Sequence, residues 1–181
     1  MLIKIEHTPN PNAIKFVIEK QWIDYVWECV NQYEADKSQI SKKLFKINGV
    51  IYLLFGKKFV VINKNKDIAW EEIEKQAVEI ISDFIKSKDN VFENDTTKIV
   101  NNKKDVSQLE QKMIEVLELK VQPAIETHGG SIEFMKFEDK TLYLNLKGAC
   151  RDCPSSEVTL QHGILNLMQY FFPEIKEVKS V

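Results

Sequence analysis

The sequence predicts an α+β protein made of two small α/β domains joined by a polar linker. In both halves of the chain, short segments of alternating apolar residues lie beside longer segments with helical periodicity. Between the halves, residues 88–105 (KDNVFENDTTKIVNNKKD) are polar and lack hydrophobic periodicity, as expected of a linker. The length of 181 residues allows two small domains, which we place at residues 1–87 and 106–181.

Composition and charge argue against several classes of partner. The chain is 44% hydrophobic and 29% charged, with a net charge of -2, which is ordinary for a protein with a buried core. No basic arm favours nucleic acid or an anionic membrane, and no apolar run is long enough to span a bilayer. The N-terminus, MLIKIEHTPNPN, looks like neither a signal peptide nor a transit peptide. We therefore expect a bacterial cytoplasmic protein, or a mitochondrial matrix protein if a targeting segment has been removed.

The first domain is predicted to begin with two short strands around a loop. Residues 2–5 and 14–18 show strand patterns, and the prolines and asparagines of Thr8–Asn12 (TPNPN) favour a turn. This loop has two interpretations, a contact with a partner or client protein and purely structural turn chemistry. Residues 22–33 are predicted to be helical. The apolar face of that helix would consist of Trp22, Val26, Cys29 and Tyr33.

The remainder of the first domain has clearer periodicity. A short helix is predicted at residues 41–45. The β-rich runs GVIYLLFG and KFVVIN meet at Gly56-Lys57, which predicts a hairpin. Residues 70–85 have apolar side chains at helical spacing with Glu and Lys between them, which predicts an amphipathic helix.

The second domain is predicted to have the order helix–hairpin–helix, with a possible last strand in EIKEVKSV. Ser107-x-x-Glu110 matches a capping box and opens the first helix. Pro123 should kink or restart that helix, and Gly129-Gly130 should end it. SIEFMKF and TLYLNLK are the predicted strands, and the second helix is predicted at residues 155–170.

A loop with two cysteines, GACRDCPSS, precedes the second helix. Cys150 and Cys153 have C-x-x-C spacing, so their thiolates can converge on one metal ion or one edge of a cluster. Pro154 suits the first turn of a helix, and Ser155-Ser156 are expected to cap it. Cys153 should therefore lie at a helix N-terminus, where the partial positive charge stabilises a thiolate. This environment favours metal binding and nucleophilic attack alike.

One such pair leaves three chemistries open. A closed zinc site or a cluster needs four ligands, and the other candidates, His128 and His162, are more simply interpreted as surface or capping residues. Cys29 is expected to be a buried, inert thiol. A thiol–disulfide oxidoreductase is the second hypothesis, although the preceding hairpin and the missing parallel crossover do not suit a thioredoxin-like fold. A zinc-bridged structural dimer is the third.

The first hypothesis is that a second copy of the chain supplies the missing ligands. Two chains related by a twofold axis would bring together Cys150 and Cys153 of each. Four thiolates are what a [4Fe–4S] or [2Fe–2S] cluster requires. A cluster held at the interface of a homodimer is retained only while the dimer is closed, which suits loading and delivery.

Motifs in both halves resemble one family. HGGSIEFMKF and LKGACRDCPSSEVTLQHGILNLMQYFFPEIKEV resemble the NifU-like C-terminal domain, with its GxCxxCPSSxxTLxxGI signature. TPNPNAIKF, SKKLFKINGVIYLLFGKKFVVINK and WEEI resemble the N-terminal domain of the same Nfu-type scaffold proteins. The resemblance implies an iron–sulfur cluster assembly scaffold or carrier, not an enzyme, that serves apoprotein clients. It also implies that Cys150 and Cys153 bind the cluster, with [4Fe–4S] favoured over [2Fe–2S].

The chain departs from the family pattern near the cysteines. Asp152 stands where the family commonly has glycine, and it follows Arg151, the only arginine in the chain. Ser131 follows the two glycines, where the family often has an acidic residue. Nearby charges and hydrogen bonds tune a cluster, so the resemblance leaves its lability and potential open.

Overall fold

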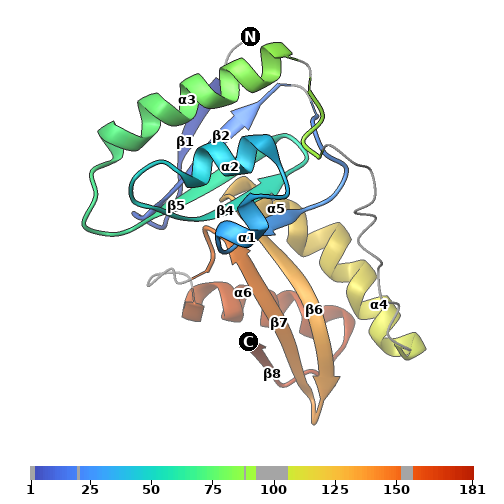
Figure 1. Cartoon of the computed structure of the whole chain (residues 1–181). Coiled ribbons are helices and arrows are strands. Elements are labelled where there is room, and N and C mark those ends of the chain that lie inside the picture. The colour runs from blue at the N-terminus through green and yellow to red at the C-terminus, as the bar shows by residue number, and fades with distance from the viewer. Residues whose placement is uncertain (1–2, 20, 88, 93–105, 152–156) are drawn as a thin grey trace. The chain divides into compact units, whose positions relative to one another are not determined.

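The computed structural model describes residues 3–19, 21–87, 89–92, 106–151 and 157–181, the side chains of residues 157–160 excepted. The chain divides into two compact units, Met1–Val100 and Asn101–Val181, which are described separately. Each unit combines one β-sheet with helices, which confirms the α+β class (Figure 1). Most of the predicted linker lies outside the described residues, so the predicted domain limits stay a prediction. Within the described ranges, no helix has the length and apolarity needed to cross a membrane.

The first unit contains a five-stranded antiparallel sheet in the order β1-β2-β5-β4-β3. Strands β4 and β5 form the predicted hairpin, in which Gly56 pairs with Phe59 across the turn. The predicted strands on either side of the TPNPN loop are β1 and β2. The strands are β1 (Ile3–His7), β2 (Ala13–Ile18), β3 (Trp27–Cys29), β4 (Val50–Gly56) and β5 (Phe59–Lys64).

Helices α2 (Gln39–Phe45) and α3 (Trp70–Ser87) share one hydrophobic core with this sheet. The core takes alternate side chains from the central strands, such as Phe16, Leu53 and Ile62, as expected for strands that turn one face to helices. Both predicted helices are confirmed. The fully or nearly buried side chains of α3 are Ile73, Ala77, Ile81 and Phe84, at the spacing of one helix face.

The prediction of a single helix at residues 22–33 is wrong. Residues 27–29 form strand β3, which pairs with β4, and only Gln32–Ala35 form a one-turn helix, α1. Trp27 and Cys29 are buried two residues apart, whereas Tyr33 is 74% exposed. The deciding interaction is the ladder to β4, which is distant in sequence, and tertiary pairing of this kind overrides local helical spacing.

Two residues of the predicted linker also belong to this core. Val91 is buried, and Phe92 packs against the ring of Trp27 with a centroid separation of 4.8 Å. The ring of Tyr25 stacks on Phe92 from another direction, with a centroid separation of 5.7 Å. The chain thus contributes to the first core beyond the end of α3.

Hydrogen bonds within the TPNPN loop support its structural interpretation. The Oγ1 of Thr8 accepts from the N–H of Asn10 at 3.2 Å, and the Oδ1 of Asn10 accepts from the N–H of Asn12 at 2.9 Å. The indole of Trp70 donates to the carbonyl of Pro11 at 2.9 Å, which ties the loop to the start of α3. Asn10 is buried, so these turn contacts account for its presence.

The second unit contains a three-stranded sheet in the order β6-β7-β8, and its helices share one core with it (Figure 1). The predicted order helix–hairpin–helix–strand is confirmed. Met113, Leu142 and Met168, from the first helix, the hairpin and the second helix, are fully buried. The elements are α4 (Gln108–Val116), η1 (Leu117–Val121), α5 (Gln122–Thr127), β6 (Gly130–Glu138), β7 (Thr141–Gly148), α6 (Glu157–Phe171) and β8 (Glu177–Ser180).

The first helix of this unit contains a π-helical turn, η1, immediately before Gln122-Pro123. Its buried residues recur every four positions: Met113, Leu117, Val121 and Ile125. In a regular α-helix each four-residue step overshoots one turn by about 40°, or about 120° over three steps. A π turn adds about one residue and absorbs most of this rotation. Regular α-helical geometry restarts at Gln122, with Pro123 in the first turn of α5, which confirms the predicted restart.

The parallel crossover that the sequence analysis considered missing is present. Strand β8 pairs with β7 in parallel register, and α6 connects them. The tail strand is short, and its partner β7 precedes it by a whole helix, so local patterns did not reveal the pairing. The expected lack of a parallel crossover therefore does not count against a thioredoxin-like redox site, whereas the preceding hairpin still does.

Cys29 is predicted to be unreactive in the folded protein. Burial raises the pKa of its thiol to about 12, so almost none of it is thiolate at pH 8. We expect iodoacetamide to leave Cys29 unmodified at pH 8 and to modify it after unfolding in guanidinium chloride, as measured by peptide mass spectrometry. Modification at the rate of a free thiol in the native protein would contradict the buried position.

The capping box of α4 is predicted to stabilise the second unit. Ser107 Oγ accepts from the N–H of Glu110 at 3.2 Å, and the Glu110 carboxylate accepts from the N–H of Ser107 at 2.8 Å. Ser107→Ala should lower the free energy of unfolding by about 1 kcal/mol, whereas Ser107→Thr should retain most of it. Urea unfolding followed by circular dichroism measures the difference.

The same box should make stability depend on pH. The hydrogen bond from the Ser107 backbone is the main cause that lowers the pKa of Glu110 below its usual 4.5. A lowered pKa stabilises the fold above pH 4.5, and this contribution disappears as the pH falls through the native pKa. The stability difference between wild type and Glu110→Gln should therefore shrink below pH 4.5. A constant difference down to pH 2.5 would argue against the cap.

Candidate metal centre

Cys150 lies two residues after the end of strand β7. Gly148, with a φ of +69°, turns the chain away from the strand, a conformation that glycine adopts without steric cost. The N–H of Ala149 then donates to the carbonyl of Gly129 at 3.0 Å, and the N–H of Arg151 donates to the carbonyl of Gly148 at 3.1 Å. The first of these bonds fastens the cysteine loop to the turn between α5 and β6, and the second closes a turn at the start of the loop.

The sulfur of Cys150 packs on the backbone at Gly130. A Cβ placed on Gly130 would overlap Cys150 Sγ and lie 2.7 Å from Cγ2 of Ile125. Cys150 is half-buried and contacts the core of the second unit. Ile125, Gly129 and Gly130 therefore form a cradle for Cys150, in which Gly130 provides space and Gly129 provides a hydrogen-bond acceptor.

Gln122 joins the helix under the cradle to strand β6. Its Oε1 accepts from the N–H of Ile132 at 3.0 Å, and its Nε2 donates to Glu126 Oε1 at 2.8 Å. The hydroxyl of Ser131 lies 3.2 Å from Nε2 and 3.4 Å from Oε1. Strand β6 is an edge strand, so without Gln122 the N–H of Ile132 would have no acceptor on the open side of the sheet. One side chain thus closes the segment that contains the cradle.

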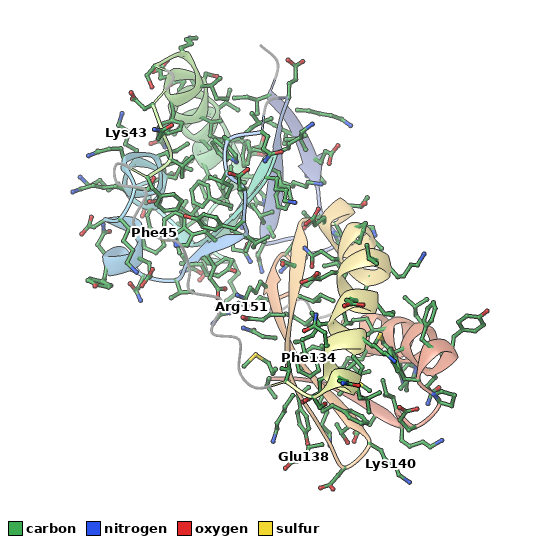
Figure 2. The ribbon with its side chains drawn as sticks, turned by 90° about the vertical axis from the view of Figure 1, so that its right-hand side faces the viewer. Lys43, Phe45, Phe134, Glu138, Lys140 and Arg151 are labelled. Carbon is green, nitrogen blue, oxygen red and sulfur yellow. The ribbon has the colours of Figure 1, made fainter. Side chains whose placement is uncertain are left out.

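Arg151 is exposed next to Cys150. In Figure 2 it lies toward one end of the β6–β7 hairpin, and Glu138 and Lys140 lie at the other end. Asp152, the residue at which the chain departs from the family pattern, lies outside the described residues.

The second predicted ligand, Cys153, also lies outside the described residues, as do Pro154 and the expected capping residues Ser155-Ser156. The described part of α6 begins at Glu157, four residues after Cys153. The assignment of Cys150 and Cys153 as cluster ligands therefore stays a prediction.

The other candidate ligands of the sequence analysis lie apart from the cradle or on the surface. Cys29 is fully buried in the first unit, as predicted for an inert thiol, although on a strand and not on a helix. His128 is exposed at the C-terminal end of α5, and His162 is exposed on α6. Among the residues that the structure describes, no three His, Cys, Asp or Glu side chains gather where they could hold a metal ion.

Sequence reasoning missed the cradle and the Gln122 contacts. Gly129-Gly130 was interpreted only as the end of a helix, whereas Gly130 also makes room for Cys150. Nothing in the sequence distinguishes Gln122 from the other glutamines, because its partner Ile132 offers a backbone N–H. A contact between one side chain and a backbone group ten residues away leaves no compositional signal.

Two family models match the chain. The model of the NifU-like domain matches residues 114–179, which includes the cysteine loop. The model of the N-terminal domain of Nfu/NifU scaffold proteins matches residues 3–88. Their order along the chain is that expected from the resemblance.

Curated relatives match over the whole chain. The human protein named "NFU1 iron-sulfur cluster scaffold homolog, mitochondrial" is 30% identical over 100% of this chain, which covers 72% of the human protein. The Drosophila erecta protein of the same name is 32% identical, again over 100% of this chain. The chain spans 65% of the length of that fly relative, slightly less than two thirds.

Solved structures show weaker similarity. A NifU-like protein from Saccharomyces cerevisiae is 22% identical, with a TM-score of 0.47 over 52% of this chain and 86% of the yeast chain. A Staphylococcus aureus protein is 19% identical, with a TM-score of 0.41 over 45% of this chain and 99% of its own. The family models and the human relative, which agree over both halves of the sequence, show that the chain belongs to the Nfu-type family of NifU-like scaffold proteins.

Proposed function

We propose that this protein is an iron–sulfur cluster scaffold or carrier that holds a cluster between two copies of the chain and transfers it to apoproteins. Cys150 and Cys153 of each copy supply the four thiolates. The observation that supports this most is the position of Cys150 at the end of β7, held by the cradle in the domain that matches the NifU-like model. A [4Fe–4S] cluster is favoured over a [2Fe–2S] cluster.

The cysteine inventory supports a site shared between chains. The chain contains three cysteines, and Cys29 is fully buried with a pKa raised to about 12. A thiol in that state is a poor metal ligand, because the thiolate is the species that binds metal. Cys150 and Cys153 remain, which is half the ligand set of a cluster. A homodimer completes the set with no further residue type.

Transfer follows from the same arrangement. A cluster bound by two thiolates from each subunit is released when thiolates of an apoprotein replace those of the scaffold, one at a time. Cys150 is half-buried and Arg151 is exposed, so both residues reach solvent. The proposed partners are a cluster donor and apoprotein clients. The protein acts as a carrier and does not need to catalyse a covalent change.

The cellular compartment is part of the proposal. The human and fly relatives are named mitochondrial, which suits the alternative of a mitochondrial matrix protein. A bacterial cytoplasm is the other candidate compartment. Fractionation of cells of the source organism, with an antibody against the protein, distinguishes the two.

Anaerobic reconstitution with iron and sulfide tests the ligand assignment. Wild-type protein should gain visible absorption and shift from monomer to dimer, because the cluster joins two chains. Cys150→Ala and Cys153→Ala should each lose most or all of this absorption. Cys29→Ala is the matched control and should retain it. Absorption spectroscopy combined with size-exclusion chromatography measures both effects.

Three measurements separate the proposal from its alternatives. A complete cluster in Cys150→Ala would exclude the ligand assignment. Zinc without acid-labile sulfide in protein purified without oxygen would favour the zinc-bridged dimer. Mössbauer spectroscopy of the reconstituted dimer decides between [4Fe–4S] and [2Fe–2S].

A thiol–disulfide oxidoreductase is the second candidate, and one observation favours it. The β7–α6–β8 crossover is parallel, so the cysteine loop connects a strand to a helix within a βαβ unit. This candidate predicts turnover in an insulin-reduction assay with a dithiol reductant. Absence of turnover, together with dimerisation on cluster loading, would leave the scaffold as the function.

Gly130→Ala should disturb the site directly. The added methyl would overlap Cys150 Sγ and crowd Ile125, so Cys150 must move, and overpacking of this kind costs about 1–3 kcal/mol. We expect a lower cluster content per dimer and a lower melting temperature. Gly163→Ala is the matched control, because a Cβ there meets no atom within 4 Å and alanine favours a helix. Equal cluster content in Gly130→Ala and wild type would contradict the role of the cradle.

A further inference from the structure

We propose that Gln122 is a positioning residue for Cys150. It does not touch the sulfur. It holds the segment on which the sulfur rests, and thereby sets how long a bound cluster is retained. The retention part of this inference rests on the proposed function, whereas the positioning part does not.

The residues of the cradle belong to one short segment. Gly129 bonds the cysteine loop, Gly130 lies under the Cys150 sulfur and Ile125 borders the same space, and all three lie between Gln122 and Ile132. The Gln122 side chain joins the two ends of this segment through its 3.0 Å bond from the Ile132 N–H. A segment closed at both ends has fewer conformations than one fastened at a single end. The sulfur of Cys150 rests on that closed segment.

Both the oxygen and the nitrogen of the Gln122 amide form hydrogen bonds. The amide of Gln122 uses its Oε1 for Ile132 and its Nε2 for Glu126 and Ser131. Ser131 is 4% exposed, so its hydroxyl depends on protein partners such as this amide. Removal of the Gln122 amide would leave a buried hydroxyl and an edge-strand N–H without these bonds, which favours local opening of the segment.

Most members of this network carry no charge. The hydroxyl of Ser131 contacts the neutral amide of Gln122. Two neutral groups form this part of the network, and one carboxylate, Glu126, completes it. The network therefore holds the cradle through hydrogen bonds more than through ion pairs, which salt would screen.

Alkylation of Cys150 in the cluster-free full-length protein tests the positioning. Trypsin cleaves after Lys147 and Arg151, so Cys150 and Cys153 fall in separate peptides and mass spectrometry follows each one. Gln122→Met has a similar length but no hydrogen bonds. We expect it to raise the rate of Cys150 alkylation by iodoacetamide roughly tenfold, the factor that corresponds to the loss of one or two hydrogen bonds from a local opening equilibrium.

Gln169→Met is the matched control. Gln169 is a half-buried glutamine of the same unit, and its Nε2 donates to the carbonyl of Ile175 at 2.8 Å, in the loop before β8. Its loss should lower the melting temperature to a similar degree and leave the alkylation of Cys150 within twofold of wild type. Equal acceleration by both variants would mean that general destabilisation exposes Cys150, and it would overturn the proposal.

An exchange of side chains provides the rescue. Gln122→Glu alone places two carboxylates four residues apart on α5, next to each other, and should accelerate alkylation as Gln122→Met does. The double variant Gln122→Glu/Glu126→Gln keeps an acceptor for the Ile132 N–H and restores an amide–carboxylate pair. It should return the rate to within about threefold of wild type. A double variant as reactive as Gln122→Glu would overturn the positioning role.

The consequence for a cluster is measured on the reconstituted dimer. An iron chelator should remove the cluster several-fold faster from Gln122→Met than from wild type or Gln169→Met, as followed by visible absorption. Unchanged alkylation in Gln122→Met would overturn the positioning role even if a cluster assembles normally. Failure of wild type to assemble a cluster would instead overturn the proposed function, and the alkylation result would still decide the role of Gln122. If Gln122→Met does not fold, Ser131→Ala, which leaves the bond to Ile132 intact, should produce a smaller acceleration of at least twofold.

Discussion

The packing of the Cys150 sulfur on the backbone at Gly130 is the contact on which the candidate site depends. The sulfur occupies the space that a Cβ at position 130 would need, so the helix end, the first residue of β6 and the cysteine loop come together only if that position is glycine. The backbone bond from Ala149 to Gly129 aligns the loop with this contact. Residues 149 and 150, in the described part of the cysteine loop, are therefore held by their contacts with Gly129 and Gly130.

The helix beneath the cradle shows how backbone geometry and packing cooperate. Its buried side chains are spaced by four residues, which a regular α-helix would spread around its surface, and the π turn brings them back to one face. Gln122 is the first residue after that turn, and it points its amide to the edge of β6. The irregular turn thus serves two purposes: it keeps the core continuous and it directs a polar side chain to an edge strand that needs an acceptor.

The two cysteines that the structure describes, Cys29 and Cys150, occupy environments that separate their chemistry. Cys29 lies on β3 in the core of the first unit, where desolvation holds its thiol neutral. Cys150 is half-buried after the end of strand β7, where its sulfur packs on the backbone at Gly130. A protein that binds a cluster transiently benefits from this division, because a reactive third thiol would compete for iron and for partner thiols. One pair per chain then makes dimerisation and cluster binding two aspects of the same proposed event.

The sequence by itself determined the α+β class, most of the helices and strands, the capping box and the resemblance to the Nfu-type family. These features depend on local periodicity, on capping residues and on motifs, which are all visible within a window of some twenty residues. Only the tertiary structure decided that residues 27–29 form a strand, that β8 pairs in parallel with β7, and that Gly130 and Gln122 support Cys150. Each of these depends on a partner that local sequence does not name, a strand edge, a backbone N–H or the space left by a missing side chain, and such partners exist only once the chain has folded.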